Sequence, residues 1–137
     1  MFGVYDTNDV AVGVCGLTSI SPLNQTGEFS LYIDPFHRRK GYAKAALLAL
    51  LDIGYMQMNL NRIWGETFSF NPASRLFESI GMKNEGTLRA SYFKEGQFVD
   101  SIIYAMLRDE YVSRYRFSSR IAYNQYRYPS DIDPSAC

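Results

Sequence analysis

One stretch of the chain, EFSLYIDPFHRRKGYAK at residues 28–44, decides the fold. Apolar and polar residues alternate over 28–33, which predicts a strand that places Glu28 on the opposite face from Phe29. Pro35 has no backbone N–H to give to a sheet and disfavours a helical residue before it, so the strand ends there. A long helix follows, and its apolar stripe comprises Leu47, Leu50, Leu51, Gly54, Tyr55 and Met58.

The turn before this helix is basic and contains a glycine. Arg38, Arg39 and Lys40 come directly before Gly41, where the helix is expected to begin. A helix N-terminus presents unpaired N–H groups and a partial positive charge, which makes it a site for phosphate. Gly41 would let a phosphate group approach the backbone closely, and the three cations suit a diphosphate. The pattern by itself is equally consistent with a solvated basic loop.

Outward from this segment, the chain alternates between strands and helices. Strand-forming residues bounded by turn residues predict strands at 1–5, 10–19, 62–68, 85–93 and 98–107. A second helix is expected between Asn71, as its N-terminal cap, and Gly81, which ends it. From residue 111 onward no helical or strand period persists. We therefore expect one domain at residues 1–110 and an extension without firm structure, rich in tyrosine and arginine, at 111–137.

The composition excludes several functional classes. The chain has 137 residues, of which 47% are hydrophobic and 20% charged, as is typical of one globular domain. Lys plus Arg and Asp plus Glu each number 14, so no net charge attracts nucleic acid or a membrane surface. The longest apolar run, residues 45–51, is shorter than the roughly 20 residues that cross a bilayer. We expect neither a membrane nor nucleic acid as a partner.

The cysteine and histidine residues give no metal-ligand spacing. Cys15 and Cys137 are interpreted as free thiols of a reducing, cytoplasmic compartment. His37 is the sole histidine in the chain. A zinc motif that uses two histidines is therefore excluded, and so is any Ser-His-Asp triad built on an imidazole other than that of His37. No metal is therefore expected.

Two motifs in this order resemble those of the GNAT superfamily of N-acetyltransferases. The pattern Arg38-x-x-Gly41-x-Ala43 is similar to the acetyl-CoA signature of that family, which lies between the central strand and the long helix. Residues 71–82, NPASRLFESIGM, are similar to the next family motif. Residues 85–100 resemble the branch that acetylates ribosomal-protein N-termini, which also includes polyamine and nucleotide amino-sugar acetyltransferases.

The resemblance covers residues 1–110 and implies an α/β (α+β) fold. Its sheet would be mixed but mostly antiparallel, flanked by helices, with splayed central parallel strands at 28–33 and 62–68. The implied activity is direct transfer of an acetyl group from acetyl-CoA to a primary amine: a peptide N-terminus, an amino sugar or a polyamine. The resemblance assigns cofactor binding to Leu31, Tyr32, Ile33, Arg38, Arg39, Lys40, Gly41, Tyr42, Ala43, Lys44, Asn71 and Phe77.

The implied transfer requires a proton acceptor. An amine with a pKa near 10 is mostly protonated at neutral pH, so a base or a water relay must take its proton. Glu28 is our candidate, although an exposed glutamate at a strand end gives the same pattern. Many family members have a tyrosine that protonates the departing thiolate, but this chain has Phe77 there. Ser74 is a candidate donor, or the thiolate leaves unaided.

The chain departs from the family pattern at its start. Family domains open with a strand and two helices that form one wall of the acceptor site, whereas this chain begins where the second strand is expected. We therefore expect a domain without that strand and helix pair: a fragment, the product of a late start, or a chain whose site is completed by its own tail or by a partner, a homo-oligomer included. Two alternatives stay open, namely a CoA-binding module without turnover and a nucleic-acid-binding protein that uses residues 38–44 and the tail.

Overall fold

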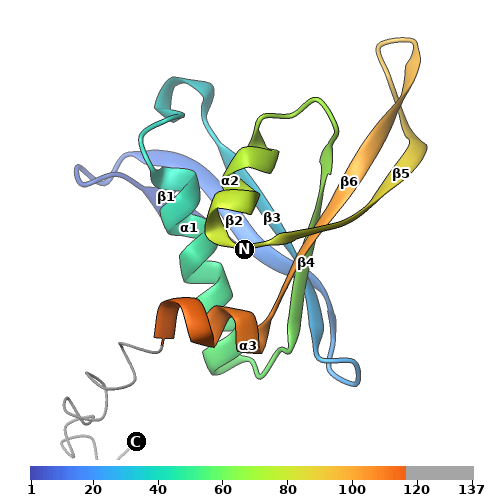
Figure 1. Cartoon of the computed structure of the whole chain (residues 1–137). Coiled ribbons are helices and arrows are strands. Elements are labelled where there is room, and N and C mark those ends of the chain that lie inside the picture. Colours follow the sequence, from blue (N-terminus) through green and yellow to red (C-terminus); the bar gives the residue numbers. More distant parts are fainter. Residues whose placement is uncertain (117–137) are drawn as a thin grey trace, which may run out of the picture.

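One six-stranded sheet, in the order β1-β2-β3-β4-β6-β5, organises the structure, a computed structural model that describes residues 1–116 (Figure 1). Among these strands β3 and β4 run parallel, and every other neighbouring pair is antiparallel. The predicted mixed, mostly antiparallel sheet is therefore confirmed. The strands are β1 (Phe2–Tyr5), β2 (Ala11–Ser21), β3 (Thr26–Ile33), β4 (Arg62–Phe68), β5 (Lys83–Lys94) and β6 (Gln97–Leu107).

In the described part of the chain, three helices cover one face of the sheet. Leu47 and Leu51 of the first helix share one buried core with Phe29 of β3 and Ile63 of β4. Burying each such side chain contributes about 1.5–3 kcal/mol, which holds the helices on the sheet. The helical segments are η1 (Pro35–His37), α1 (Tyr42–Asp52) with its π-helical continuation η2 (Ile53–Gln57), α2 (Ala73–Ile80), and α3 (Arg108–Tyr111) with its π-helical continuation η3 (Val112–Arg116).

The apolar stripe predicted for α1 is confirmed except at its last residue. Leu47, Leu50, Leu51 and Tyr55 are at most 1% exposed, whereas Met58 is 40% exposed. The π-helical turn of η2 has a wider hydrogen-bond spacing than an α-helix, so the 3.6-residue period no longer holds when the chain reaches Met58. The helix stripe therefore ends one turn earlier than the sequence predicts.

The predicted boundaries agree with the structure to within one or two residues, and β4 has the bounds that were predicted. At the start of α2, Asn71 Oδ1 accepts a 2.9 Å hydrogen bond from the Ala73 N–H, which confirms Asn71 as a cap. Gly81 ends α2 with a φ of 110°, the left-handed conformation that favours glycine. Local turn and cap chemistry is therefore sufficient to place these boundaries.

Residues 111–116 differ from the expected extension without firm structure. They continue α3 as a helix, and the side chain of Tyr111 is only 4% exposed. The Tyr111 hydroxyl donates a 2.7 Å hydrogen bond to Asp52 Oδ1, and Arg114 donates to the Ser79 carbonyl at 2.7 Å. Six residues are too few to show a helical period, so no pattern in the sequence indicates a helix in this segment. Residues 117–137, with Cys137, lie outside the described residues.

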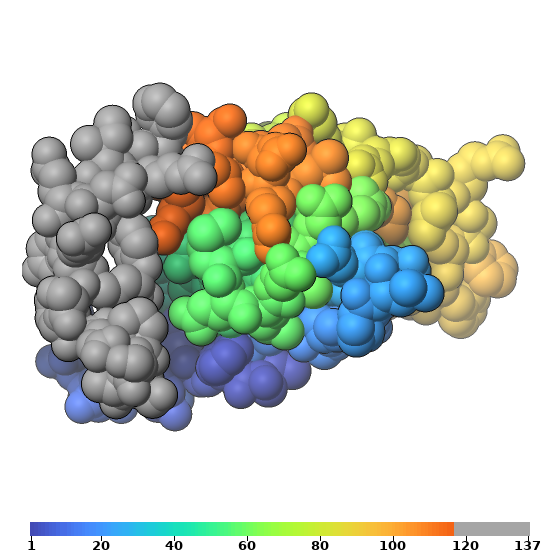
Figure 2. All heavy atoms as spheres, turned by 90° about the horizontal axis from the view of Figure 1, so that it is seen from below, coloured from blue at the N-terminus to red at the C-terminus, as the bar shows by residue number. Residues whose placement is uncertain are grey.

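The β5–β6 hairpin projects beyond the helices and forms one end of the molecule (Figures 1 and 2). Every residue of β5 is exposed, because this edge strand pairs with β6 alone. The sheet face opposite the helices, which we call the open face, carries Val14 and Tyr32; their side chains are 45% and 54% exposed. In residues 1–116, no helix has both the length and the apolar character needed to span a membrane.

Candidate functional site

The parallel strands β3 and β4 stay paired over only three residues each. Thr26 pairs with Arg62, Gly27 with Ile63 and Glu28 with Trp64. Beyond these pairs, β3 continues to Ile33 and β4 to Phe68 without further pairing between them. The splayed parallel strands that were predicted are therefore present. Their facing edges leave backbone N–H and C=O groups available to an extended ligand.

The basic turn joins the end of β3 to the start of α1. Asp34 Oδ1 accepts a 2.9 Å hydrogen bond from the Phe36 N–H, which turns the chain out of the sheet. Gly41 then precedes α1 with a φ of 85°, and no side chain caps the helix. Apart from Gly41 itself and its neighbours in the chain, the described residues place no atom within 4 Å of the point where a Cβ on Gly41 would be. The first-turn amides of residues 42–44 therefore have neither an intrahelical partner nor a side-chain cap.

The three cations of the turn do not have the same role. Arg38 Nε donates a 3.0 Å hydrogen bond to the Ile33 carbonyl, and its guanidinium carbon lies 5.9 Å from the centre of the Tyr32 ring. Arg39 and Lys40 are exposed. Arg38 is exposed as well, but its hydrogen bond also ties the turn to the end of β3.

The predicted cofactor residues of β3 and of the turn form one continuous region. Leu31 is half-buried, Tyr32 is exposed and Ile33 is buried, and all three lie in the part of β3 that pairs with β2 but not with β4. The hydrogen bond between Arg38 and Ile33 brings the turn against the end of this strand. Tyr42 and Ala43 at the helix start are half-buried, and Lys44 is exposed.

The predicted residues on α2 contribute to the cap and to the core. The hydroxyl of Ser74 donates a 3.2 Å hydrogen bond to the Asn71 carbonyl, so both residues take part in the start of the helix. Phe77 is 6% exposed, and its ring packs edge-on against Phe29 with centres 5.2 Å apart. The ring of Tyr104 lies 5.5 Å away on another side of Phe77. Phe77 is therefore a core residue as well as the position where relatives are expected to carry a tyrosine.

Two carboxylates, Glu28 and Glu66, occupy the open face beside the opening, and Glu28 was predicted from the sequence. Glu28 is half-buried, and its Oε2 accepts a 3.4 Å hydrogen bond from Ser19 Oγ. Glu66 shares the face of Trp64 because the two are two residues apart on β4. The pKa of Tyr92 is raised by its hydrogen bond to Glu66, by the charge of Glu66 and by the more distant charge of Glu28. The signal that could have found Glu66 is the alternation of β4, which places it on the face of Glu28.

Glu66 lines a cavity of about 200 Å³ at the end of β4. Ser101 Oγ on β6 donates a 2.5 Å hydrogen bond to Glu66 Oε1, and the Tyr92 hydroxyl donates to Oε2 at 3.2 Å. The cavity reaches Asn71, the residue that caps α2, so it extends from the end of β4 to the start of that helix. Its lining is Glu66, Thr67, Phe68, Asn71, Tyr92 and Ser101.

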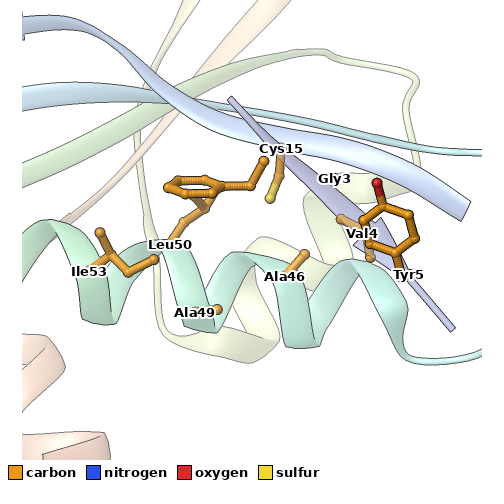
Figure 3. Close-up of a pocket in the computed structure, with 9 residues that line it drawn as sticks. Gly3, Val4, Tyr5, Cys15, Ala46, Ala49, Leu50 and Ile53 are labelled. Carbon is orange, nitrogen blue, oxygen red and sulfur yellow. The ribbon is translucent and has the colours of Figure 1, made fainter. Parts of the chain in front are cut away.

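A second, larger cavity of about 330 Å³ lies between β1 and α1 (Figure 3). Its walls are mostly hydrocarbon, from residues such as Val4, Ala46 and Leu50, and the Cys15 side chain points toward it. Burial raises the pKa of the Cys15 thiol, which keeps the thiol neutral at physiological pH. The lining of this cavity includes the Tyr5 hydroxyl and the neutral Cys15 thiol but no charged side chain, so the opening between β3 and β4 is the better candidate for binding a diphosphate.

Comparison with known proteins agrees with this geometry. Residues 1–83 match a family model described as an acetyltransferase (GNAT) domain. An uncharacterized N-acetyltransferase, p20, of Bacillus licheniformis is 32% identical over 109 residues, which are 79% of this chain and 61% of that protein. The spermidine N(1)-acetyltransferase of Vibrio cholerae is 30% identical over 114 residues, which are 82% of this chain and 66% of that enzyme. The chain thus spans slightly less than two thirds of the length of these relatives.

Solved structures of the Vibrio cholerae enzyme have the same fold. A complex of spermidine N-acetyltransferase with CoA and spermine superposes with a TM-score of 0.76 at 28% identity, covering 79% of this chain and 64% of that one. A dodecameric structure of the same enzyme gives a TM-score of 0.77 at 28% identity, covering 81% and 66%.

Proposed function

The chain belongs to the GNAT family of acetyltransferases, and we propose that it transfers an acetyl group from acetyl-CoA to a primary amine. The observation that carries the proposal is the separation of β3 from β4 beside an uncapped helix N-terminus. The residues present fit acetyl-CoA, because a diphosphate needs amides and cations and pantetheine needs an extended backbone edge. When bound, acetyl-CoA supplies the acetyl group as an activated thioester.

We propose that the turn binds the diphosphate. The amides of residues 42–44 and the exposed side chains of Arg39 and Lys40 are the groups available for it. The edge of β3 at residues 31–33 would pair with pantetheine, and the bond from Arg38 to Ile33 would keep that edge in place. Asn71 would lie near the thioester because it lines the cavity that contains Glu66, and Phe77 would support this end of the site by packing on Phe29.

Glu28 is the proposed proton acceptor for the amine. It is in the last residue pair before the strands separate, so its carboxylate lies at the narrow end of the opening. A primary ammonium has to lose a proton before it can react, and a carboxylate or a water held by it can take that proton. Ser74 is the proposed donor to the departing sulfur, since its hydroxyl lies at the start of α2.

The acceptor is proposed to be a small primary amine of the polyamine class. The support is the likeness to a protein named spermidine N(1)-acetyltransferase and the pair of carboxylates on the open face. A peptide N-terminus and an amino sugar are the competing acceptors.

We also propose a homo-oligomer, because a similar enzyme is described as a dodecamer and β5 is exposed along its length. A cytoplasmic location is proposed from the free thiol of Cys15.

Free-thiol release from acetyl-CoA, measured with a panel of amines, tests this function. The proposal expects thiol release that depends on the amine and saturates with it. A second candidate, a CoA-binding module without turnover, is favoured by Phe77, which has no hydroxyl to protonate a thiolate. Binding of CoA without release on any amine would support that module. Salt-dependent RNA binding that CoA does not compete would instead support the nucleic-acid alternative.

A further inference from the structure

Lys94 places a primary ammonium group against two aromatic rings at the end of β4. Its Nζ lies 4.6 Å from the centre of the Phe68 ring and 5.5 Å from that of Phe70. The two rings are stacked, with centres 5.5 Å apart and planes 6° from parallel. An ammonium over aromatic faces at these distances is held by cation–π attraction. The chain's own alkylammonium group therefore occupies these aromatic faces.

The aromatic surface continues inward to a carboxylate. The Phe68 ring meets the Tyr92 ring edge-on, with centres 5.3 Å apart, and the Tyr92 hydroxyl donates to Glu66. Glu66, Phe68 and Tyr92 together line the cavity of about 200 Å³. We call Glu66, Phe68, Phe70 and Tyr92 the ammonium cluster. A carboxylate at the inner end and aromatic faces toward solvent are the groups that recognise an alkylammonium ion.

The carboxylate of the ammonium cluster is held in place and retains capacity for a ligand. Ser101, which is fully buried, donates to Glu66 Oε1, and Ser101 also shares a 2.7 Å hydrogen bond with Ser91. A carboxylate has about four acceptor sites, and these two hydrogen bonds use one on each oxygen. The ion pairs formed within residues 1–116 do not include Glu66. A ligand cation can therefore pair with it.

We infer that the ammonium cluster binds the non-reacting ammonium group of a diamine or polyamine. This inference rests on the proposed function, in which the other nitrogen reaches the opening and gives its proton to Glu28. Glu66 lies two residues beyond Trp64, the partner of Glu28, so both carboxylates border the same opening. Lys94 is exposed at the end of β5, and its flexible side chain can return to water when a ligand ammonium takes its place.

Two probes of equal length test the inference: 1,4-diaminobutane, which carries two ammonium groups, and 1-butylamine, which carries one. In the unaltered chain, we expect a KM for the diamine that is roughly tenfold lower, because a hydrogen-bonded charge pair is added. Glu66→Gln should raise the KM for the diamine by about the same factor and leave its kcat and the KM for 1-butylamine nearly unchanged. Glu95→Gln, which removes the same charge at the exposed turn of the β5–β6 hairpin, is the matched control.

Two further variants separate the rings from the lysine. Phe70→Ala should raise the KM for the diamine by about two- to fivefold, because one cation–π contact is lost. Phe98→Ala, which removes a similarly exposed ring on β6, should leave that KM unchanged. Lys94→Gln should lower the KM for the diamine, because the internal competitor for the rings is removed.

The outcomes distinguish this inference from the proposed function. Equal KM values for the two probes would overturn the inference while acetyl transfer stands. A Glu66→Gln variant that loses kcat with an unchanged KM would also overturn it and make Glu66 the proton acceptor. Calorimetric binding of 1,4-diaminobutane needs no turnover. If the unaltered chain binds this diamine, acetylates no amine and loses the binding on Glu66→Gln, the proposed function fails while the ammonium cluster remains a binding site for an alkylammonium ion. Unfolding temperatures confirm that each variant is folded. Tyr92→Phe removes one hydrogen bond to Glu66, so it should raise the KM for the diamine by less than Glu66→Gln does.

Discussion

Glu28 on β3 is in register with Trp64 on β4, and this is the last residue pair that joins the two parallel strands. The strands separate immediately beyond it, so the carboxylate of Glu28 lies where the opening begins. Glu66 follows on the same face of β4, two residues further along. The open face thus presents two carboxylates to any amine that approaches the opening. The proposed acetyl transfer depends on this arrangement.

The first prediction concerns Glu28. Glu28→Gln should lower kcat for the preferred amine by roughly 100-fold, because a positioned base contributes about that much to a proton transfer. The affinity for acetyl-CoA should not change. Thiol release measured over a range of pH tests this, with Glu95→Gln as a charge-matched control. A variant with the kcat and pH profile of the unaltered chain would show that Glu28 is not the proton acceptor.

The second prediction concerns the cations of the turn. Removing two of the three exposed charges, by Arg39→Ala with Lys40→Ala, should weaken acetyl-CoA binding at least roughly tenfold, because two charge-assisted contacts to phosphate are lost. The dependence of the dissociation constant on salt should also become weaker. Calorimetry at two ionic strengths measures both effects. Arg75→Ala, at an exposed cation on α2, serves as control, and equal losses in the two variants would contradict the assignment.

The third prediction concerns Phe77. Phe77→Ala should lower the free energy of unfolding by about 3–5 kcal/mol, because a buried ring between Phe29 and Tyr104 would be replaced by a cavity. Phe98→Ala, at a ring that is 70% exposed, should change the free energy by no more than about 0.5 kcal/mol. Denaturant unfolding compares the two. Similar values for both variants would show that the ring of Phe77 is not packed in the core.

The fourth prediction concerns acidic pH. The hydrogen bond from Lys83 and that from the Leu107 N–H lower the pKa of Glu110 below its usual value of 4.5. A carboxyl group whose pKa is lowered by folding stabilises the folded chain above its usual pKa, and this stabilisation is lost as the pH falls through the lowered value. Glu110→Gln should therefore unfold at a lower temperature at pH 7. The difference should shrink progressively below pH 4.5, and a difference that persists at pH 2 would contradict the assignment.

Local sequence patterns were sufficient to predict the elements that position the site. Alternation over residues 28–33 and the stop at Pro35 indicated β3, and the glycine turn indicated the start of α1. The cap at Asn71 and the ending at Gly81 likewise follow from residues within a few positions of each other. Such features depend on neighbours along the chain, so a single sequence contains them.

The features that the sequence did not predict depend on distant contacts. Glu66 meets Tyr92 across 26 positions and Ser101 across 35, and both contacts follow from the pairing of β4 with β6 and of β6 with β5. The hydrogen bond from Arg38 to the Ile33 carbonyl depends on the side-chain conformation of Arg38, which the sequence pattern does not predict. The helix at 111–116 is short, and it is held by contacts with Asp52 and Ser79 rather than by a period of its own.

A crystal structure of the full chain with acetyl-CoA at millimolar concentration would show whether the cofactor binds in the opening between β3 and β4. We expect electron density for the diphosphate against the amides of residues 42–44. We also expect density for pantetheine between Ile33 of β3 and Phe68 of β4. An opening without such density at that concentration, or acetyl-CoA bound elsewhere on the chain, would show that the opening is not the cofactor site.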